Sequence, residues 1–308
     1  MYKKLSLLSL TLLLSSLHFQ TSQAQTRGFH FLRTTIGARP SALAGAFTAI
    51  KGDIHSVTAN PAALSSINGK AATFDYVNSA LDIQSGFGAY VQDFGGGKVA
   101  LAFQYQDYGS FETTDALGTE LGSFSANSLV LTAAYSQKYT DELSVGGAVK
   151  FIHSGIDVYS TSGFAADLAL FYDAPIFGGL QVGGGVFNLG KATSAFIETK
   201  ESMPTRFEIG VSKRLAHLPL QYSLTAQKYL DDDFYFAAGG EFRLSEQLKW
   251  RIGYNSIGSD LKIGGEGRFA GVSTGFGVKI QDKYGFDYAY SSMGTVGAQI
   301  LISFSLQL

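Results

Sequence analysis

The chain has 308 residues, no cysteine, a formal net charge of −2 and only 16% charged residues. Without cysteine there is neither a disulfide framework nor a cysteine for lipid attachment, and the near-neutral balance offers no basic surface for nucleic acid. The counts of glycine (37), phenylalanine (24) and tyrosine (16) are typical of short aromatic strands joined by tight turns.

Residues 1–24 have the pattern of a secretory signal peptide. Two lysines precede an apolar run over residues 5–17, and Ser-Gln-Ala at residues 22–24 fits a cleavage site. No later apolar stretch approaches the roughly 20 residues that a transmembrane helix needs. We therefore expect an exported protein whose membrane spans, if any, are strands.

Residues 25–69 form a separate segment ahead of the strands. Pro40 suits the first turn of a helix, and apolar residues at 43, 47 and 50 have helical spacing, so one short helix is predicted there. Residues 54–59 predict a second short turn. It must end at Asn60, because the residue before a proline is disfavoured in a helix.

From residue 70 to residue 308 apolar residues recur at every second position, which indicates strands with one apolar face. The alternation is cleanest over residues 99–106, 220–227, 248–255 and 284–290. The pattern predicts an all-β fold, a 14-stranded antiparallel transmembrane β-barrel. The expected strands are 70–79, 83–93, 97–108, 124–138, 142–154, 160–173, 178–188, 204–214, 219–228, 233–244, 247–257, 266–280, 283–290 and 296–307.

Loop lengths support a membrane barrel over a soluble sandwich or propeller. The connections after even-numbered strands have four residues or fewer, whereas those after odd-numbered strands include 109–123, 189–203 and 258–265. Short turns belong on the periplasmic side, so both ends of the barrel domain should lie there. The last strand carries apolar residues from Ile300 to Leu308 on one face, and we expect it to close the barrel.

The N-terminal segment contains Gly37-x-Arg39, Gly45, Asp53 and the run Asn60-Pro61-Ala62. With these residues it resembles the hatch of the FadL-like outer-membrane proteins, specifically the PorV/PorQ family. A second stretch, residues 204–220, also looks similar to PorQ-type sequence. The resemblance implies that residues 25–69 fold into the lumen as a short helical hatch, and that residues 70–308 form the barrel. The hatch motif consists of Gly37, Arg39, Gly45, Asp53, Asn60, Pro61 and Ala62.

If the apolar strand faces contact lipid, the opposite faces point into the lumen, and these carry charges of both signs. We expect the charges to pair with one another and with the hatch, which avoids burying any of them alone. A ladder that binds a solute is the alternative interpretation. The residues are Lys150, Asp167, Arg206, Glu208, Glu241, Arg243, Lys249, Arg251 and Asp287.

Catalytic motifs are absent from the sequence, so we expect no enzyme, cofactor or metal site. It has no Gly-x-Ser-x-Gly elbow, His-Glu-x-x-His motif or Walker-type loop. His30, His55, His153 and His217 are too far apart for a local metal site, and each is expected to be a solvated or hydrogen-bonded surface residue. The glycines at 183–185 lie within a strand, so they indicate a bend or a close backbone approach.

What the resemblance implies for function is an accessory barrel of type IX secretion or surface attachment in the outer membrane of a Gram-negative cell. Such a barrel would hold partner proteins through loops 109–123 and 189–203, and the modest length of the chain favours a PorQ-like role. The alternative is a FadL-like transporter whose hydrophobic ligand leaves sideways at a kinked strand, with 178–188 the best candidate. A purely structural outer-membrane protein is a third option. Lipid, protein partners and a hydrophobic ligand are the expected contacts, and nucleic acid is not.

Overall fold

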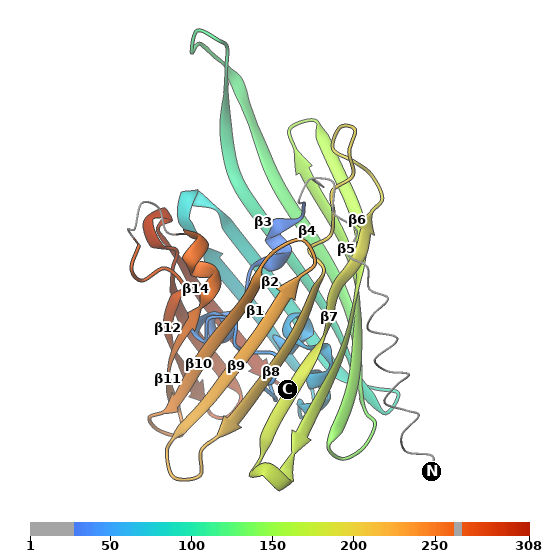
Figure 1. The fold of residues 1–308 in the computed structure, drawn as a ribbon, viewed down its shortest axis with the longest axis vertical. Helices are drawn as coiled ribbons and strands as arrows, with labels where there is room; N and C mark the ends of the chain where they lie inside the picture. The colour runs from blue at the N-terminus through green and yellow to red at the C-terminus, as the bar shows by residue number, and fades with distance from the viewer. Residues whose placement is uncertain (1–27, 262–266) are drawn as a thin grey trace, which may run out of the picture.

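Fourteen antiparallel strands close into one barrel in this computed structural model, which describes residues 28–261 and 267–308 (Figure 1). Each strand pairs with its neighbours in the chain, and β1 (Ala71–Asn78) pairs with β14 (Ala298–Gln307) to complete the ring. The predicted fold class is confirmed, whereas the signal peptide predicted for residues 1–24 lies outside the described residues. The other strands are β2 (Gln84–Phe94), β3 (Gly97–Thr114), β4 (Glu120–Lys138), β5 (Leu143–Ile156), β6 (Tyr159–Ala174), β7 (Leu180–Ala192), β8 (Arg206–Arg214), β9 (Leu220–Tyr229), β10 (Phe234–Arg243), β11 (Leu248–Asn255), β12 (Val272–Ile280) and β13 (Tyr284–Ser292).

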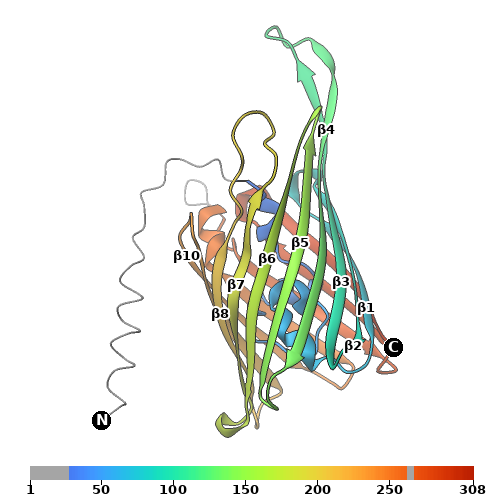
Figure 2. The same cartoon turned by 90° about the vertical axis from the view of Figure 1, so that its right-hand side faces the viewer.

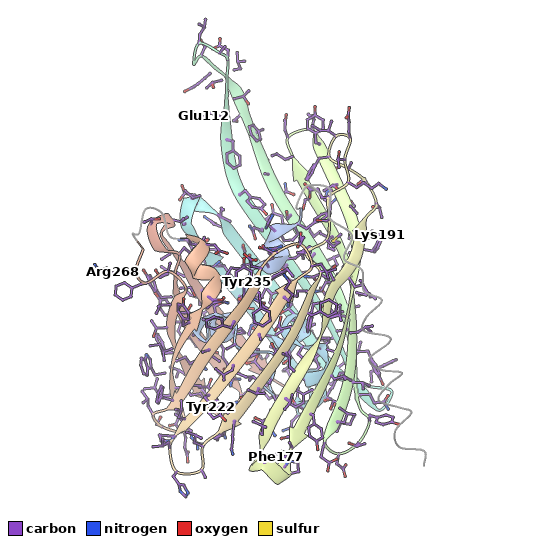
Figure 3. The ribbon with its side chains drawn as sticks, in the orientation of Figure 1. Glu112, Phe177, Lys191, Tyr222, Tyr235 and Arg268 are labelled. Atoms are coloured by element: carbon purple, nitrogen blue, oxygen red, sulfur yellow. The ribbon has the colours of Figure 1, made fainter. Side chains whose placement is uncertain are left out.

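The outer wall is apolar because alternate residues of every strand point outward. Leu101 on β3 is 61% exposed and Leu168 on β6 is 65% exposed, whereas the inward-facing Ala100 and Asp167 beside them are buried. Side chains cover the outside of the barrel over its whole height (Figure 3). A large apolar surface of this kind is stable when lipid, and not water, covers it.

The two ends of the barrel differ in the way the sequence predicts. At one end the strands are joined by short turns, such as residues 95–96 and 281–283, and the C-terminus lies at this end (Figure 2). At the other end the connections include residues 193–205 and 256–271. We call these the short-turn end and the long-loop end.

The expected loop 109–123 is wrong, because most of it is strand. β3 continues to Thr114 and β4 begins at Glu120, so only residues 115–119 form the turn of a hairpin that projects far beyond the barrel (Figures 1 and 2). Phe111 stacks on Phe124 across the hairpin with ring centroids 5.3 Å apart. This cross-strand pair and the paired backbone keep the strands together beyond the barrel.

The helical elements are all short. The first predicted helix ends early, at Ala42, because Ala44 and Gly45 have φ angles of 53° and 81°, which no helix tolerates. The second predicted turn is present, and it ends at Asn60 as expected. No helix in the described ranges is long and apolar enough to cross a membrane. The hatch contains η1 (His30–Arg33), α2 (Ala38–Ala42), α3 (Ser56–Ala59) and η2 (Pro61–Ser66), and the connections contain η3 (Ala80–Asp82), η4 (Pro175–Phe177), η5 (Ser256–Leu261) and η6 (Gly294–Val296).

Candidate functional site

The hatch lies inside the barrel, against wall positions that are glycine (Figures 1 and 2). A Cβ atom on Gly183 of β7 would sit 2.2 Å from the carbonyl oxygen of Thr48. One on Gly253 of β11 would sit 2.4 Å from the carbonyl carbon of Leu43. The close backbone approach predicted for the glycines at 183–185 therefore occurs at Gly183. Four further wall glycines also face the hatch at close range, namely Gly146, Gly210, Gly239 and Gly275.

Apolar side chains of the hatch complete its contact with the wall. Leu43, Val57 and Leu64 are fully buried. Val57 and Leu64 belong to the same apolar cluster as Phe87 and Val91 of β2. Burying one such side chain contributes about 1.5–3 kcal/mol, so the hatch is held by packing as well as by polar contacts.

The Asn-Pro-Ala part of the hatch motif holds the hatch in place through hydrogen bonds of the Asn60 side chain. The Asn60 side-chain nitrogen donates hydrogen bonds to the carbonyl oxygens of Thr48 (2.8 Å) and Leu170 on β6 (3.1 Å). Its side-chain oxygen accepts one from the backbone N–H of Ala62 (3.0 Å), which caps η2 where Pro61 begins it. One amide therefore joins two hatch segments to the barrel wall.

Gly37, the first residue of the hatch motif, occupies a position that excludes a side chain. It has a φ angle of 87°, and a Cβ atom there would lie 2.3 Å from the His55 ring. Glycine is therefore required both by the backbone conformation and by the space that His55 fills.

Arg39 and Asp53 of the motif belong to a chain of ion pairs that begins on β1. The Nε2 atom of His55 lies 2.9 Å from Asp75 of β1, and its Nδ1 atom lies 2.7 Å from Asp53. The other oxygen of Asp53 accepts a hydrogen bond from Arg39 at 2.9 Å. Arg39 then donates two bonds, at 2.8 and 3.0 Å, to Glu241 of β10. The hatch is thus linked to two strands that are not neighbours, β1 and β10.

The chain of ion pairs continues along the wall from Glu241. Arg251 of β11 donates to Glu241 at 2.7 Å and to Asp287 of β13 at 2.5 Å, and Lys249 lies 3.5 Å from Glu241. A Cβ atom on Gly277 would lie 2.2 Å from Asp287, so glycine leaves room for this pair. We call the whole set the ion chain: Asp75, His55, Asp53, Arg39, Glu241, Arg251, Lys249 and Asp287.

Protonated His55 gives the ion chain equal numbers of acidic and basic groups. Burial disfavours its charge, but the carboxylates of Asp75 and Asp53 outweigh burial and raise the pKa of His55 well above its ordinary value. Burial likewise opposes the charge of Asp53, but His55 and Arg39 hold the pKa of that carboxyl well below its usual range. The prediction that His55 is a surface residue was wrong, because the ring is buried.

We predict that attachment of the hatch depends on pH. The contribution of His55 is fully present below its unfolded pKa of about 6.5 and is lost as pH rises through its raised folded value. The contribution of Asp53 is present above about pH 3.9 and is lost as pH falls towards its lowered folded value. Hydrogen exchange of the backbone amides of residues 53–57, corrected for intrinsic rates, should speed up at alkaline pH. A His55→Gln variant should lack that alkaline step, and an identical step in this variant would contradict the prediction.

A second group of polar contacts surrounds an irregularity between β6 and β7. The pairing of these strands shifts register between Ala166 and Leu168, where Asn188 has a φ angle of 55°. The backbone N–H of Asn188 donates to the Asp167 carboxylate at 2.8 Å, and Lys150 contacts Asp167 and the Asn188 side chain at 2.7 Å each. The predicted kink region 178–188 therefore ends at a real interruption, and Asn188, not a glycine, forms it.

Of the remaining predicted lumen charges, two form a buried ion pair and the third is exposed. Arg206 donates to Glu208 at 2.7 Å, and Glu208 also accepts a hydrogen bond from the hatch residue Thr48. Arg243 is exposed at the short-turn end of β10 and makes no ion pair with any described residue. Eight of the nine charges are thus placed in ion pairs, and Arg243 stays outside them.

On its long-loop side the hatch closes a cavity of about 390 Å³, which we call the outer chamber. The hatch contributes Ile36, Pro40 and Phe47 to its surface. The barrel contributes mainly neutral polar side chains, among them Gln104, Gln106, Gln227, Gln299, Thr132 and Thr225.

A smaller hollow of about 240 Å³ lies on the short-turn side of the hatch. It is lined by members of the ion chain, including Arg39, Asp53 and Lys249. No residue lines both this hollow and the outer chamber. The hatch and its ion chain therefore lie between the two spaces.

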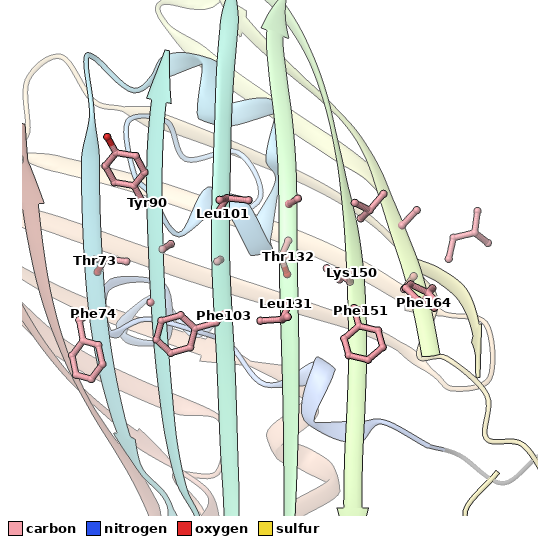
Figure 4. Close-up of a pocket in the computed structure, with 18 residues that line it drawn as sticks. Thr73, Phe74, Tyr90, Leu101, Phe103, Leu131, Thr132, Lys150, Phe151 and Phe164 are labelled. Carbon is pink, nitrogen blue, oxygen red and sulfur yellow. The ribbon is translucent and has the colours of Figure 1, made fainter. Parts of the chain in front are cut away.

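A third hollow, of about 960 Å³, faces outward (Figure 4). It follows a cross-strand row in which Phe74, Phe103, Leu131 and Phe151 lie side by side in register around Gly88. Because these side chains point away from the lumen, the groove is part of the lipid-facing wall.

Sequence reasoning missed several residues of the site, and one of them could have been found. Asp75 has the inward phase of its alternating strand, and the rule that selected the other lumen charges selects it too. Thr48 and Asn188 have no such signal, because their roles depend on contacts with distant parts of the chain. Among the described residues, no group of three or more acidic, histidine or cysteine side chains could hold a metal ion.

No protein-family model and no curated protein matches the sequence, but solved structures match the fold. The toluene transporter TbuX of Ralstonia pickettii has a TM-score of 0.64 and 14% identity over 89% of this chain and 98% of its own. The toluene transporter TodX of Pseudomonas putida has a TM-score of 0.63 and 13% identity over 92% and 99%. A Pseudomonas aeruginosa FadL homologue has a TM-score of 0.59 and 11% identity over 92% and 99%. At such low identity the likeness concerns architecture alone, and the chain therefore has the fold of the FadL-like barrels.

Proposed function

We propose that this protein is an outer-membrane channel that admits small, largely apolar molecules. The observation that carries the proposal is the outer chamber, a cavity of about 390 Å³ that is closed on the inner side by a docked hatch. The apolar outer wall suits a membrane, and the signal peptide predicted for residues 1–24 supports export to it. The solved structures with the same fold include toluene transporters, which supports the choice of a small apolar cargo.

We further propose that the cargo leaves the chamber sideways, at the interruption between β6 and β7. Lys150 lines both the outer chamber and the outward groove. At this residue the two spaces are therefore only one strand layer apart. At Ala166 the strand pairing shifts, and a side-chain contact from Asp167 replaces the regular ladder. Separating β6 from β7 at this point breaks fewer backbone hydrogen bonds than at a regularly paired point of the wall.

Uptake of radiolabelled toluene by intact cells tests the channel, because toluene crosses simple phospholipid vesicles unaided. A host without its own FadL-like barrels should take up toluene faster when it carries this protein. The variant Ala166→Trp, which places a large ring beside the interruption, should slow uptake severalfold. Ala133→Trp is the matched control, since Ala133 lies in the same cross-strand row on a regularly paired strand.

Three results are distinguishable. Slower uptake only in Ala166→Trp supports both the channel and the sideways route. Equal uptake in the two variants would overturn the route and leave the channel intact. Uptake no faster than in cells without the protein would overturn the proposed function.

A second candidate function, attachment of partner proteins, rests on the projecting hairpin. β2 pairs with β3 only as far as Asp107, and β5 pairs with β4 only as far as Ala126. Beyond these residues neither outer edge of the hairpin pairs with another described strand. It carries Glu112, Asp115 and Glu120, while no lysine or arginine occurs between residues 99 and 137. An acidic arm with free strand edges suits a basic protein partner, in keeping with the type IX role that the PorV/PorQ resemblance implies. Replacing residues 108–125 by a tight turn and comparing surface and secreted proteins tests this role, which fails if the secreted set is unchanged.

A further inference from the structure

The outer chamber has an apolar side that suits a small organic molecule. Ile36 and Phe47 of the hatch line it, as do Val130 of β4 and Ile257 of η5. A volume of about 390 Å³ lies within the range of small-molecule sites in proteins. The apolar part alone would accept any compact hydrocarbon.

The charges around the chamber are already neutralised. Its charged lining residues are Arg33, Lys150, Arg206 and Glu208. Arg206 pairs with Glu208, and Lys150 pairs with the carboxylate of Asp167 on β6. Arg33 contacts two carboxylates, those of Asp231 and Asp232. Each cation of the chamber already has a carboxylate partner, so a charge on the ligand would not be neutralised there, and the chamber favours a neutral molecule.

Two hydrogen-bond donors at the chamber wall are unused. Gln104 on β3 is 7% exposed, and its side-chain Nε2 atom is buried without a hydrogen-bond partner among the described residues. Its cross-strand neighbours are Phe87 and Val130, which offer no acceptor from their side chains. The Nε atom of Arg33 is unpartnered in the same way. An unmet donor in such surroundings is costly, and an acceptor atom of a ligand removes that cost.

We propose that the outer chamber selects small neutral molecules that carry a hydrogen-bond acceptor, such as a ketone, ester or ether oxygen, and that Gln104 recognises this acceptor. The inference rests on the proposed channel function and adds a ligand class to it. A plain hydrocarbon enters the apolar part but leaves the Gln104 donor unmet. A carboxylate finds every chamber cation already paired. A neutral oxygenated molecule satisfies both parts of the chamber.

Two probes of the same shape separate these possibilities. Acetophenone carries a carbonyl oxygen where α-methylstyrene carries a methylene group, and benzoate supplies the charged comparison. Binding of each probe to the full-length barrel in detergent is measured by equilibrium dialysis against micelles without protein. We expect acetophenone to bind about fivefold more tightly than α-methylstyrene, the difference that one neutral hydrogen bond makes. Benzoate should bind more weakly than acetophenone.

The variant Gln104→Met tests the residue directly. It keeps the length of the side chain and removes an unmet donor, so the barrel should fold, and the preference for acetophenone should disappear without loss of α-methylstyrene affinity. Gln181→Met is the matched control, because Gln181 is equally buried but lies outside the chamber and bonds to Asp173 and Gly179. This control should keep the preference.

The result that overturns the inference is equal affinity for the two isosteres, a preference that survives Gln104→Met, or benzoate binding as tightly as acetophenone. The uptake and binding experiments together show whether the ligand preference or the proposed channel function is wrong. Toluene uptake in cells without any acetophenone preference would remove this inference alone. An acetophenone preference in a protein that gives no uptake would remove the proposed transport and leave the binding site.

Discussion

The variant Arg251→Glu should release the hatch and lower the stability of the barrel. Arg251 is 2% exposed and contacts Glu241 at 2.7 Å and Asp287 at 2.5 Å. Removing one partner of a buried pair costs about 3–5 kcal/mol, and reversing its charge adds repulsion among three carboxylates. Folded barrels migrate faster than unfolded ones in detergent gels, so the temperature at which this fast form disappears should fall. Protease cleavage within residues 28–69 should rise at the same time.

Arg243→Glu is the control for this experiment. Arg243 lies on the neighbouring strand β10 and undergoes the same reversal of charge, but it is exposed and has no ion pair with a described residue. Its melting temperature and hatch cleavage should match those of the wild type. If Arg251→Glu behaved like Arg243→Glu, the ion chain would not hold the hatch, and a ladder that binds a solute would become the better interpretation of these charges.

The variant Gly183→Val should push the hatch away from the wall and open the lumen. A Cβ atom at this position would lie 2.2 Å from the Thr48 carbonyl oxygen and 2.7 Å from the Asn60 side chain, so the hatch backbone itself must move. Overpacking of this kind typically costs about 1–3 kcal/mol. It also separates Thr48 from its hydrogen bond to Glu208. Once the outer chamber joins the inner hollow, ion conductance through the barrel in a planar bilayer should rise above that of the wild type.

Gly86→Val distinguishes loss of the hatch contact from the effect of adding a branched residue to a strand. No heavy atom lies within 4 Å of a Cβ atom built on Gly86, and its φ angle is ordinary for a strand. Its conductance should stay at the wild-type level. Low conductance in Gly183→Val as well would mean that the hatch does not seal the lumen by its contact with β7.

The strands, their number and the two unlike ends of the barrel were predictable because each depends on local pattern. Alternation with a period of two is a property of neighbouring residues, and it places each side chain inside or outside without knowledge of the rest of the fold. The same phase identified the lumen charges, including Glu241 and Arg251. Asp75 has the same inward phase, so the same rule would have placed it among the lumen charges.

Local pattern was less reliable where a segment leaves regular structure. Residues 109–114 and 120–123 are polar enough to resemble a loop, yet they form strands because each edge pairs with the other beyond the barrel. Leu43, Phe47 and Ile50 have helical spacing, but the chain turns at Ala44, and the three side chains are buried in one apolar cluster inside the barrel. In both cases packing against a distant or opposite segment outweighed local preference.

By itself, the sequence determined a closed barrel of fourteen strands with an apolar exterior, a charged interior and short turns at one end. Only the tertiary structure decided which charges meet, because partners such as Arg39 and Glu241 are 202 residues apart and come together through strand register and the placement of the hatch. It also decided that His55 is buried between two carboxylates and that the side-chain nitrogen of Gln104 lies at a chamber wall without a hydrogen-bond partner in the described part of the chain. Burial and pairing depend on the surroundings of a residue in space, and a pattern of neighbours in sequence does not contain them.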